Sequence, residues 1–415
     1  NGKLVYTPKD LTSQATYSLA QIVKIMAMHR ATDLFGPIPY SDMEPGKIKA
    51  KYDSQEKVYK SFLKELDDAV TILNQYGANN KLLESFDPVY QGDTAKWIRL
   101  ANSLMLRLAM RVRFADQALA QQYVIKATTN LGGLIEDDSQ AGKLVTSSKY
   151  IFDHSLVTML GYGELKMGAT IYSYLKGYND PRMAKYFTKA TADTQTSDFY
   201  AVRSGIDPTT DVAVYKNFSV PTVVQTTPTY WLRASEVQFL LAEAALIGWY
   251  TNDTAENLYK KGIEVSFAEN GLTAAQAQSY YNSSAQPANY ADPKNSVYNI
   301  SAASTIDKKW LTSGSTEDHL EQIITQKYLA NYPNGFESWS EWRRTGYPRM
   351  FTAALNRTNV GVQNIPASGK DFGMRRFPFP ENEFKQNREN VTAAQSLLGG
   401  TDNAATNVWW DKKTK

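Results

Sequence analysis

Residues 228–267 contain the pattern that most limits how this chain can fold. Apolar side chains recur there at steps of three and four, or sums of these, which is the spacing of one helix face. The residues of this stripe are Leu232, Phe239, Leu240, Ala244 and Ile247. Polar residues at 251–254 interrupt the stripe, and the last three of them are residue types that cap helices. We therefore expect one helix over about 230–250 and a second that begins near Ala255.

Small residues suit these two helices to close packing against each other. Ala242, Ala244, Ala245 and Gly248 leave room for a neighbouring backbone, and Leu258, Tyr259 and Ile263 would face back across the pair. The spacing of Ala244, Gly248, Ala255 and Tyr259 loosely resembles a tetratricopeptide helical hairpin. A single hairpin cannot bury its own apolar face, so the sequence predicts further hairpins stacked on this one.

Helical patterns recur through most of the rest of the chain. The first covers residues 10–33, and the second runs from the proposed cap Asp53 to Tyr76. A third helix starts near Asp93, and residues 117–130 are expected to form its antiparallel partner. Further helical patterns cover residues 164–178, 306–332 and 336–351. Residues 131–148 and 361–373 are expected to be loops, 149–163 show little helical period, and 188–227 indicate short strands or loops. The predicted fold is all-α, with stacked tetratricopeptide-like hairpins, a loop-rich face and minor β structure.

No linker or shift in composition divides the 415 residues. We expect a single domain over 1–415, with the helical scaffold mainly in 10–130 and 229–355. A loop-rich ligand-binding face is expected mainly from 131–228 and 271–300.

Composition excludes several classes of function. Lys and Arg total 45 against 42 for Asp and Glu, so charge gives no argument for nucleic acid or an anionic membrane. Cysteine is absent, which excludes disulfides and thiolate chemistry. No apolar run is long enough to span a bilayer. The chain opens at Asn1 with neither a start methionine nor a signal peptide, so we expect a mature or truncated product.

Five stretches, spread in order over nearly the whole chain, resemble the SusD/RagB family of outer-membrane nutrient-binding lipoproteins. They are ATDLFGPIPYS at 31–41, AKWIRLANSLMLRLAMRV at 95–112, YWLRASEVQFLLAEAALIGW at 230–249, GFESWSEWRRTGYPR at 335–349 and RRFPFPENEFKQN at 375–387. The NDPR segment at 179–182 and GFESW at 335–339 are similar to the SusD-like branch of that family.

The resemblance implies four tetratricopeptide-like helix pairs that support a loop-rich ligand face. It implies a protein on the extracellular face of the outer membrane, held by an N-terminal lipid anchor that this chain lacks. It also implies a TonB-dependent, SusC-like transporter as partner, which receives glycans or, in some members, peptides. One sugar-contacting aromatic residue of the starch-binding member lies in the segment that is missing here, so its counterpart would be missing too.

Catalytic motifs are absent from the sequence. Its three histidines lie far apart, and it contains no zinc-protease, dinucleotide or P-loop motif. We therefore expect no enzyme activity, no cofactor and no metal site. A glycosidase needs two carboxylates about 5–10 Å apart across a cleft, and calcium can be bound by backbone carbonyls, so sequence alone leaves both possibilities open.

Aromatic residues in loops are the best candidates for ligand contacts, because a sugar ring can stack on an exposed aromatic face. The family's ligand face corresponds here to 150–162 and its flank, where we select Tyr162 first and then Tyr150, His154 and Glu164. The Tyr-rich insertion at 271–300, with Tyr290, is the second candidate. In each case the alternative is that the tyrosine braces its own loop, and the insertion could instead face the transporter.

Charged residues beside the apolar stripes are expected to be structural. A charge persists in such a position only when it is paired. We therefore predict that ion pairs lock the hairpins together, through Arg233, Glu236, Glu243, Arg343, Arg344 and Arg376. Three functions remain in competition at this point: delivery of oligosaccharides or peptides, glycan processing by an all-helical enzyme, and a scaffold that binds protein alone.

Overall fold

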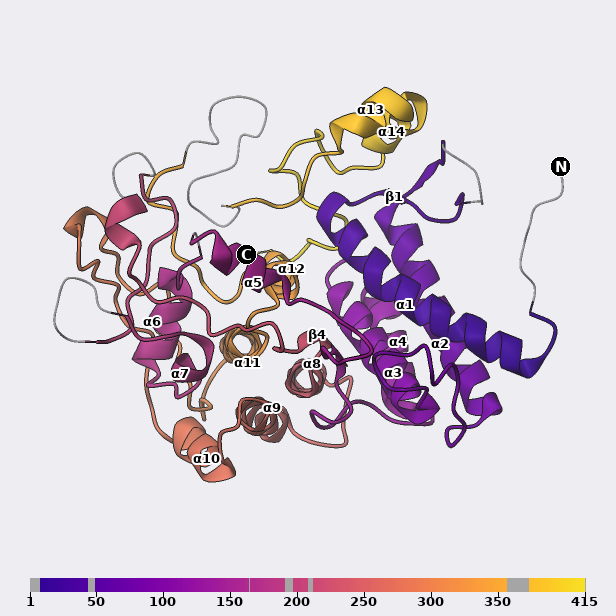
Figure 1. Cartoon of the computed structure of the whole chain (residues 1–415), viewed down its shortest axis with the longest axis horizontal. Helices are drawn as coiled ribbons and strands as arrows, with labels where there is room; N and C mark the ends of the chain where they lie inside the picture. The colour runs from indigo at the N-terminus through magenta and orange to yellow at the C-terminus, as the bar shows by residue number, and fades with distance from the viewer. Residues whose placement is uncertain are drawn as a thin grey trace. The chain divides into compact units, whose positions relative to one another are not determined.

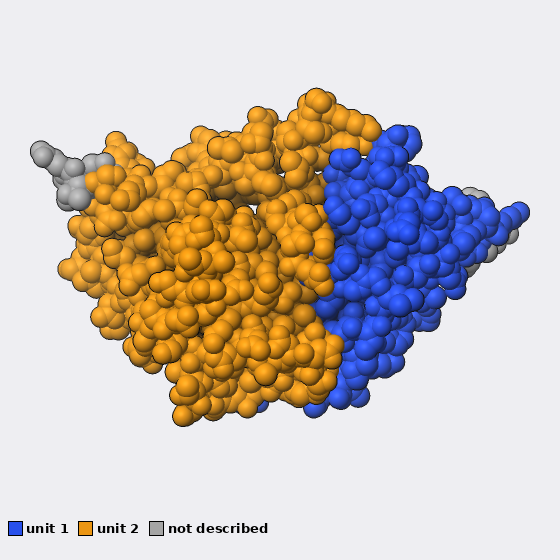
Figure 2. Space-filling model, turned by 90° about the horizontal axis from the view of Figure 1, so that it is seen from below, with its two compact units in different colours: residues 1–135, 339–345, 358–415 blue, residues 136–338, 346–357 orange. Residues whose placement is uncertain are grey.

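The computed structural model describes residues 8–43, 49–163, 165–190, 197–207, 212–356 and 373–414. The chain forms two compact units, shown in two colours in Figure 2. Unit 1 comprises residues 1–135, 339–345 and 358–415, and unit 2 comprises 136–338 and 346–357. Each unit is therefore assembled from segments that are distant in sequence. That the whole chain acts as a single domain stays a prediction.

Unit 1 is built on four consecutive helices, each packed against the next (Figure 1). They are α1 (Leu11–Phe35), α2 (Gln55–Tyr76), α3 (Thr94–Arg111) and α4 (Gln117–Thr129). Strands β1 (Ile38–Pro39) and β2 (Tyr52–Asp53) form a short antiparallel ribbon in the loop between α1 and α2. Near the carboxyl end, α13 (Glu381–Gln386) and α14 (Arg388–Gln395) form a small pair, and α14 contacts β2.

Side-chain caps explain where the unit 1 helices begin. The carboxylates of Asp10 and Asp93 accept hydrogen bonds from the third residue along, at 2.9 and 3.0 Å, which satisfies an otherwise unpaired backbone donor. The predicted cap of α2 was wrong by one residue, because Ser54 holds that position. Asp53 instead accepts the backbone N–H of Ser41 at 2.6 Å and pairs with Lys57, so it fixes the preceding loop.

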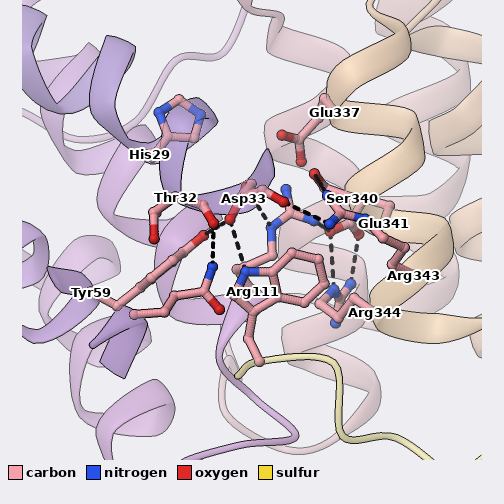
Figure 3. A network of polar contacts seen from close by, with 12 residues as sticks. His29, Thr32, Asp33, Tyr59, Arg111, Glu337, Ser340, Glu341, Arg343 and Arg344 are labelled. Atoms are coloured by element: carbon pink, nitrogen blue, oxygen red, sulfur yellow. Dashed lines mark hydrogen bonds and ion pairs between the residues drawn. The ribbon is translucent and has the colours of Figure 1, made fainter. Parts of the chain in front are cut away.

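A buried polar network lies at the carboxyl end of α1 (Figure 3). Asp33 accepts the hydroxyl of Tyr59 at 2.5 Å and the indole N–H of Trp410 at 2.8 Å. The guanidinium of Arg111 lies 3.7 Å from the Asp33 carboxylate and donates to Glu341 at 2.6 Å. These groups are almost fully buried, so each charge requires its partners. The network joins α1, α2, α3 and the carboxyl-terminal tail.

Three arginines selected from the sequence lie in unit 1. Arg344 pairs with Glu341 at 2.6 Å, and Arg376 pairs with Asp402 at 2.5 Å. Arg343 donates instead to the backbone carbonyls of Asp33 and Arg375, at 2.6 and 2.8 Å, and it stacks on Trp339. Burial lowers the pKa of Arg343 to about 9. Ion pairing is thus confirmed for Arg344 and Arg376, whereas backbone carbonyls hold Arg343.

Unit 2 combines a second helical layer with long irregular segments (Figure 1). Its helices are α5 (Ser155–Gly161), α6 (Ala169–Gly177), α7 (Met183–Tyr186), α8 (Ala234–Leu246), α9 (Ala255–Glu269), α10 (Ala274–Asn282) and α11 (Thr316–Ala330), with short 3-10 turns at Val212–Tyr215 and Ser296–Tyr298. Strands β3 (Gly142–Leu144) and β4 (Thr229–Leu232) pair antiparallel. Helix α12 (Gly335–Thr345) begins in unit 2 and ends in unit 1.

The hairpin predicted at 228–267 is confirmed as α8 and α9, but its first helix is shorter than predicted. Residues 230–232 belong to β4, which pairs with β3 from 90 residues earlier in the chain. At the other end, Gly248 has φ of +76°, which ends the helical path before Tyr250. Thr254 caps α9 and accepts the backbone N–H of Asn257 at 3.2 Å. Helix α11 packs against both members of the pair.

Other boundaries in unit 2 also differ from the sequence predictions. The stretch 149–163, which shows little helical period, contains α5, and the helix predicted over 164–178 begins later, at Ala169. The insertion at 271–300 contains α10. One helix, α11, occupies the region where one or two were expected. The loop predicted at 361–373 falls mostly outside the described residues.

Buried ion pairs hold the α8–α9 pair, as predicted for Arg233 and Glu236, whereas the ion pair of Glu243 stays a prediction. Arg233, which precedes α8, lies 3.7 Å from the Glu269 carboxylate at the end of α9. Glu236 on α8 lies 3.8 Å from the ammonium of Lys327 on α11. Glu243 is fully buried on the same helix. These contacts link the two ends of the hairpin and connect it to α11.

We predict that Gly262→Ala destabilises the protein, although alanine favours helix by about 1 kcal/mol over glycine. A Cβ at Gly262 would lie 2.6 Å from the ring of Phe239 on α8, and overpacking of this kind costs about 1–3 kcal/mol. Urea denaturation would measure the change. Gly161→Ala is the matched control, because that site in α5 is open. If Gly262→Ala were as stable as the wild type or more stable, the close packing of α9 on α8 at Gly262 would be contradicted.

Candidate functional site

The candidate site is a surface ridge formed by residues 150–163 of unit 2, which we call the α5 ridge. It begins in a tight loop, where the N–H of Ser147 donates to the Tyr150 carbonyl at 2.8 Å and the N–H of Tyr150 donates to the Ser147 hydroxyl at 3.1 Å. Phe152 donates its N–H to the Thr146 hydroxyl at 3.2 Å. These bonds fold the segment back on itself and fix its backbone, and of its side chains Ile151 and Asp153 are exposed.

Helix α5 forms the second half of the ridge and has no buried residue. Its sequence, SLVTMLG, is nevertheless mostly apolar, and Met159 is exposed. Ile151 before the helix is 74% exposed, and Tyr162 after it is 69% exposed. Gly163, with φ of +75°, turns the chain away after Tyr162. The ridge therefore presents aromatic and aliphatic side chains together to solvent.

Tyr162 has the geometry that was expected of a ligand-contacting aromatic residue, since its ring is accessible at the carboxyl end of α5. Tyr150 is half-buried and lies over Phe152, with ring centres 6.4 Å apart and planes inclined by 17°. Lys149 places its ammonium 5.0 Å from the Tyr150 ring. One end of the ridge thus has a paired aromatic surface, and the other has a projecting ring.

His154 is differently placed from the two tyrosines. It is buried, caps α5, and its Nδ1 accepts the backbone N–H of Leu156 at 3.3 Å. Burial, and then the positive charge of Arg233, lower the pKa of His154 below its ordinary value of 6.5. This histidine positions the ridge and offers little surface to a ligand. Glu164 lies outside the described residues.

The Tyr-rich insertion places its rings inside unit 2. Tyr290 is 2% exposed, and its hydroxyl lies 2.8 Å from both the Ala201 carbonyl and the Asp292 carboxylate, which share its one proton as acceptors. Burial, followed by the hydrogen bond to Asp292, raises the pKa of Tyr290 well above 10, so the hydroxyl stays neutral. Its neighbours Tyr280, Tyr281 and Tyr298 are buried as well. We conclude that these tyrosines brace the insertion, and we do not include Tyr290 in the site.

Sequence reasoning missed the aliphatic part of the ridge. Ile151 and Met159 were not selected, although a dense apolar run without a regular period is unusual in a segment predicted to be a loop. Only the folded chain shows that these side chains remain uncovered within the unit to which they belong. Large exposed apolar residues in one place are typical of binding surfaces.

Within the residues that the structure describes, no three His, Asp or Glu side chains are grouped so as to hold a metal ion. Across the same described ranges, none of the helices has the length and apolarity needed to cross a bilayer.

A family model for Susd and RagB outer membrane lipoproteins matches residues 3–411. The chain belongs to the SusD-like family. This membership confirms the resemblance inferred from the five sequence stretches, and it places the protein at the outer membrane as a lipoprotein. No curated protein sequence is significantly similar to the chain.

Solved SusD-like structures have the same fold. A chitin-binding SusD homologue from Flavobacterium johnsoniae is 35% identical, with a TM-score of 0.90 over 96% of this chain and 81% of that chain. A SusD homologue from Bacteroides uniformis is 36% identical, with a TM-score of 0.87 over 97% and 85%. One from Bacteroides thetaiotaomicron is 35% identical, with a TM-score of 0.87 over 97% and 83%. The predicted helical, tetratricopeptide-like SusD fold is confirmed.

We predict that acidification weakens the SusD-like fold partly through His154. Because the folded state lowers this pKa, the unfolded chain takes up the proton first as the pH falls. The stability contributed by neutral His154 is complete above pH 6.5 and is lost as the pH falls from there through the folded-state pKa. His154→Asn keeps a hydrogen-bond acceptor for Leu156 but cannot titrate.

Thermal unfolding midpoints between about pH 7.5 and 5 would test this prediction. The midpoint of the wild type should fall more steeply with acidification than that of His154→Asn. His319→Asn is the control, since this second histidine is only half-buried and stacks on Trp310. Parallel curves for the wild type and His154→Asn would refute the assignment.

Proposed function

We propose that this SusD-like protein is a non-catalytic receptor on the extracellular face of the outer membrane. It captures oligosaccharides on the α5 ridge and passes them to a TonB-dependent, SusC-like transporter. It is attached to that membrane as a lipoprotein. The observation that supports the proposal most directly is the exposed ring of Tyr162 on a ridge whose backbone is fixed by its own hydrogen bonds.

A sugar ring suits this surface for a physical reason. Pyranose rings present a face of C–H groups that packs on an aromatic ring, while their hydroxyls need polar neighbours. Tyr162 and the Tyr150–Phe152 pair supply ring faces at the two ends of the ridge. The Asp153 carboxylate next to Phe152 accepts from Gln225 at 2.6 Å, and both polar residues are exposed at the surface. This arrangement fits an extended oligosaccharide better than a single sugar.

Chitin oligosaccharides are the first ligands to test. The related Flavobacterium johnsoniae protein is chitin-binding, and its similarity covers 96% of this chain and 81% of its own length. The chemistry of the ridge is compatible with such a ligand, because an N-acetyl group adds a methyl that can pack on Ile151 or Met159. The same aliphatic residues also suit apolar peptide side chains, so peptides form the second test group.

A binding role is favoured over glycan processing. A glycosidase places two carboxylates opposite each other across a cleft. In the sequence of the α5 ridge, Asp153 is the single acidic residue, and its side chain is engaged by Gln225. Helix α5 has no buried residue, so this part of the ridge is open to solvent.

We predict that Tyr162→Ala weakens the binding of chitin oligosaccharides by about 1–2 kcal/mol, or roughly five- to thirty-fold. The loss arises because the ring face is the largest accessible aromatic surface of the ridge. Isothermal titration calorimetry on the purified chain would measure it. Tyr17→Ala is a matched control, because Tyr17 is a partly exposed tyrosine on α1 in unit 1.

Two outcomes would contradict the proposal. Equal affinities of the wild type and Tyr162→Ala would remove Tyr162 from the site. Cleavage of the oligosaccharide during incubation, detected by chromatography, would reject a receptor without catalysis. If peptides bind and no oligosaccharide does, the ligand class must be changed to peptide.

A further inference from the structure

A second segment of unit 2 contacts the α5 ridge, at residues 222–227, which we call the Gln225 turn. Its Gln225 side chain donates to the Asp153 carboxylate at 2.6 Å, across 72 positions of the sequence. Asp153 follows Phe152, so the contact joins the turn to the end of the ridge that has the paired aromatic surface. Gln225 is exposed, and Val224 before it is 59% exposed. The proposed binding surface therefore continues from the ridge onto the Gln225 turn.

Hydrogen bonds fix the backbone of the Gln225 turn. The N–H of Val224 donates to the Thr227 hydroxyl at 3.0 Å, and the N–H of Thr227 donates to the Val224 carbonyl at 2.9 Å. At the base of the turn, the N–H of Thr222 donates to the carbonyl of Tyr186, the last residue of α7, at 2.9 Å. Gln225 is thus carried by an ordered segment, and its contact holds the Asp153 carboxylate in one place.

The Asp153–Gln225 pair keeps hydrogen-bonding capacity for a ligand. A carboxylate only accepts, so Gln225 must donate to it, and the amide oxygen of Gln225 points elsewhere. Among the described residues, this contact is the one hydrogen bond that either side chain makes. Both side chains are exposed. The second oxygen of Asp153 and the amide oxygen of Gln225 are therefore two acceptors that a ligand can reach.

Two acceptors and one negative charge select a ligand by its donors. An amide N–H has no lone pair, so it can donate to a carboxylate without placing another oxygen against the acceptors. A hydroxyl also donates, but its own lone pairs then lie close to the acceptor oxygens. A hydrogen bond to an ionised acceptor is stronger than one between neutral groups. The pair thus suits a sugar with an acetamido group better than one with a hydroxyl in its place.

We propose that Asp153, positioned by Gln225, makes the α5 ridge specific for glycans whose sugars carry an acetamido group. The amide N–H of that group donates to the Asp153 carboxylate while the sugar ring packs on the Tyr150–Phe152 pair. This assignment rests on the proposed function, because it requires that the ridge bind oligosaccharides. It adds which part of the ligand the protein recognises and which side chain recognises it.

Isothermal titration calorimetry with chitotetraose and cellotetraose would test the assignment, since these two oligosaccharides share a backbone and linkage and differ in the acetamido group. The wild type should bind chitotetraose about three- to tenfold more tightly, the range of one hydrogen bond. Asp153→Asn removes the charge but keeps an oxygen for Gln225, and it should lose most of that preference. Asp68→Asn is the matched control, because it removes an exposed carboxylate on α2 in unit 1, and it should keep the preference.

Tyr162→Ala separates ring packing from specificity. It should weaken the binding of both oligosaccharides to the same extent and leave their ratio unchanged, because Tyr162 lies at the other end of the ridge. Circular dichroism would verify that each variant is folded.

Three outcomes would overturn the assignment while the receptor function stands. They are equal affinity of the wild type for the two oligosaccharides, an unchanged preference in Asp153→Asn, and tighter binding of an oligogalacturonate than of chitotetraose. In the last case a cation such as Lys149, whose ammonium lies 5.0 Å from the Tyr150 ring, would set the specificity instead. If the wild type binds no oligosaccharide at all, the proposed function itself is rejected, and the assignment with it.

Discussion

Charge buried between apolar helices is the constraint on which both units depend. In unit 1, Arg111 connects Asp33 at the end of α1 with Glu341 in α12. In unit 2, Lys327 lies near both Glu236 and Glu337. Apolar helix faces can slide along one another with little change in free energy, whereas a buried charge is stable only opposite its partner. The ion pairs therefore select one register among many that hydrophobic packing would allow.

Because the helices are fixed in one register, they also fix the ends of the segments that connect them, and the proposed binding site lies on one such segment. The α5 ridge is held by local hydrogen bonds around Thr146, Ser147 and His154, and its apolar side chains face outward. The loop around Asp87 in unit 1 is also held by local hydrogen bonds, since the Asp87 carboxylate accepts from the backbone N–H groups of Val89 and Gly92. In both places hydrogen bonds within the segment fix the backbone, and at the proposed binding site on the α5 ridge this reduces the entropy that binding would cost.

The helical part of the fold was largely predictable from sequence, because periodicity and caps are local signals. Asp10, Asp93 and Thr254 cap helices where the sequence indicated helix starts. Predictions were wrong where a partner distant in sequence decides the structure. Residues 230–232 fit the helical stripe of α8, yet they pair with β3. Likewise, no local pattern indicated that the packing of unit 2 buries the tyrosines of the 271–300 insertion.

By itself, the sequence determined the helical hairpins, the absence of thiol chemistry and the membership in the SusD-like family, because each depends on residue identity and short-range spacing. The tertiary structure decided which aromatic residues stay in water. Tyr162 and Tyr290 are the same residue type and both were selected from the sequence as ligand contacts, yet one is 69% exposed and the other 2%. Exposure depends on what the rest of the chain places over a side chain, and no local pattern encodes that covering.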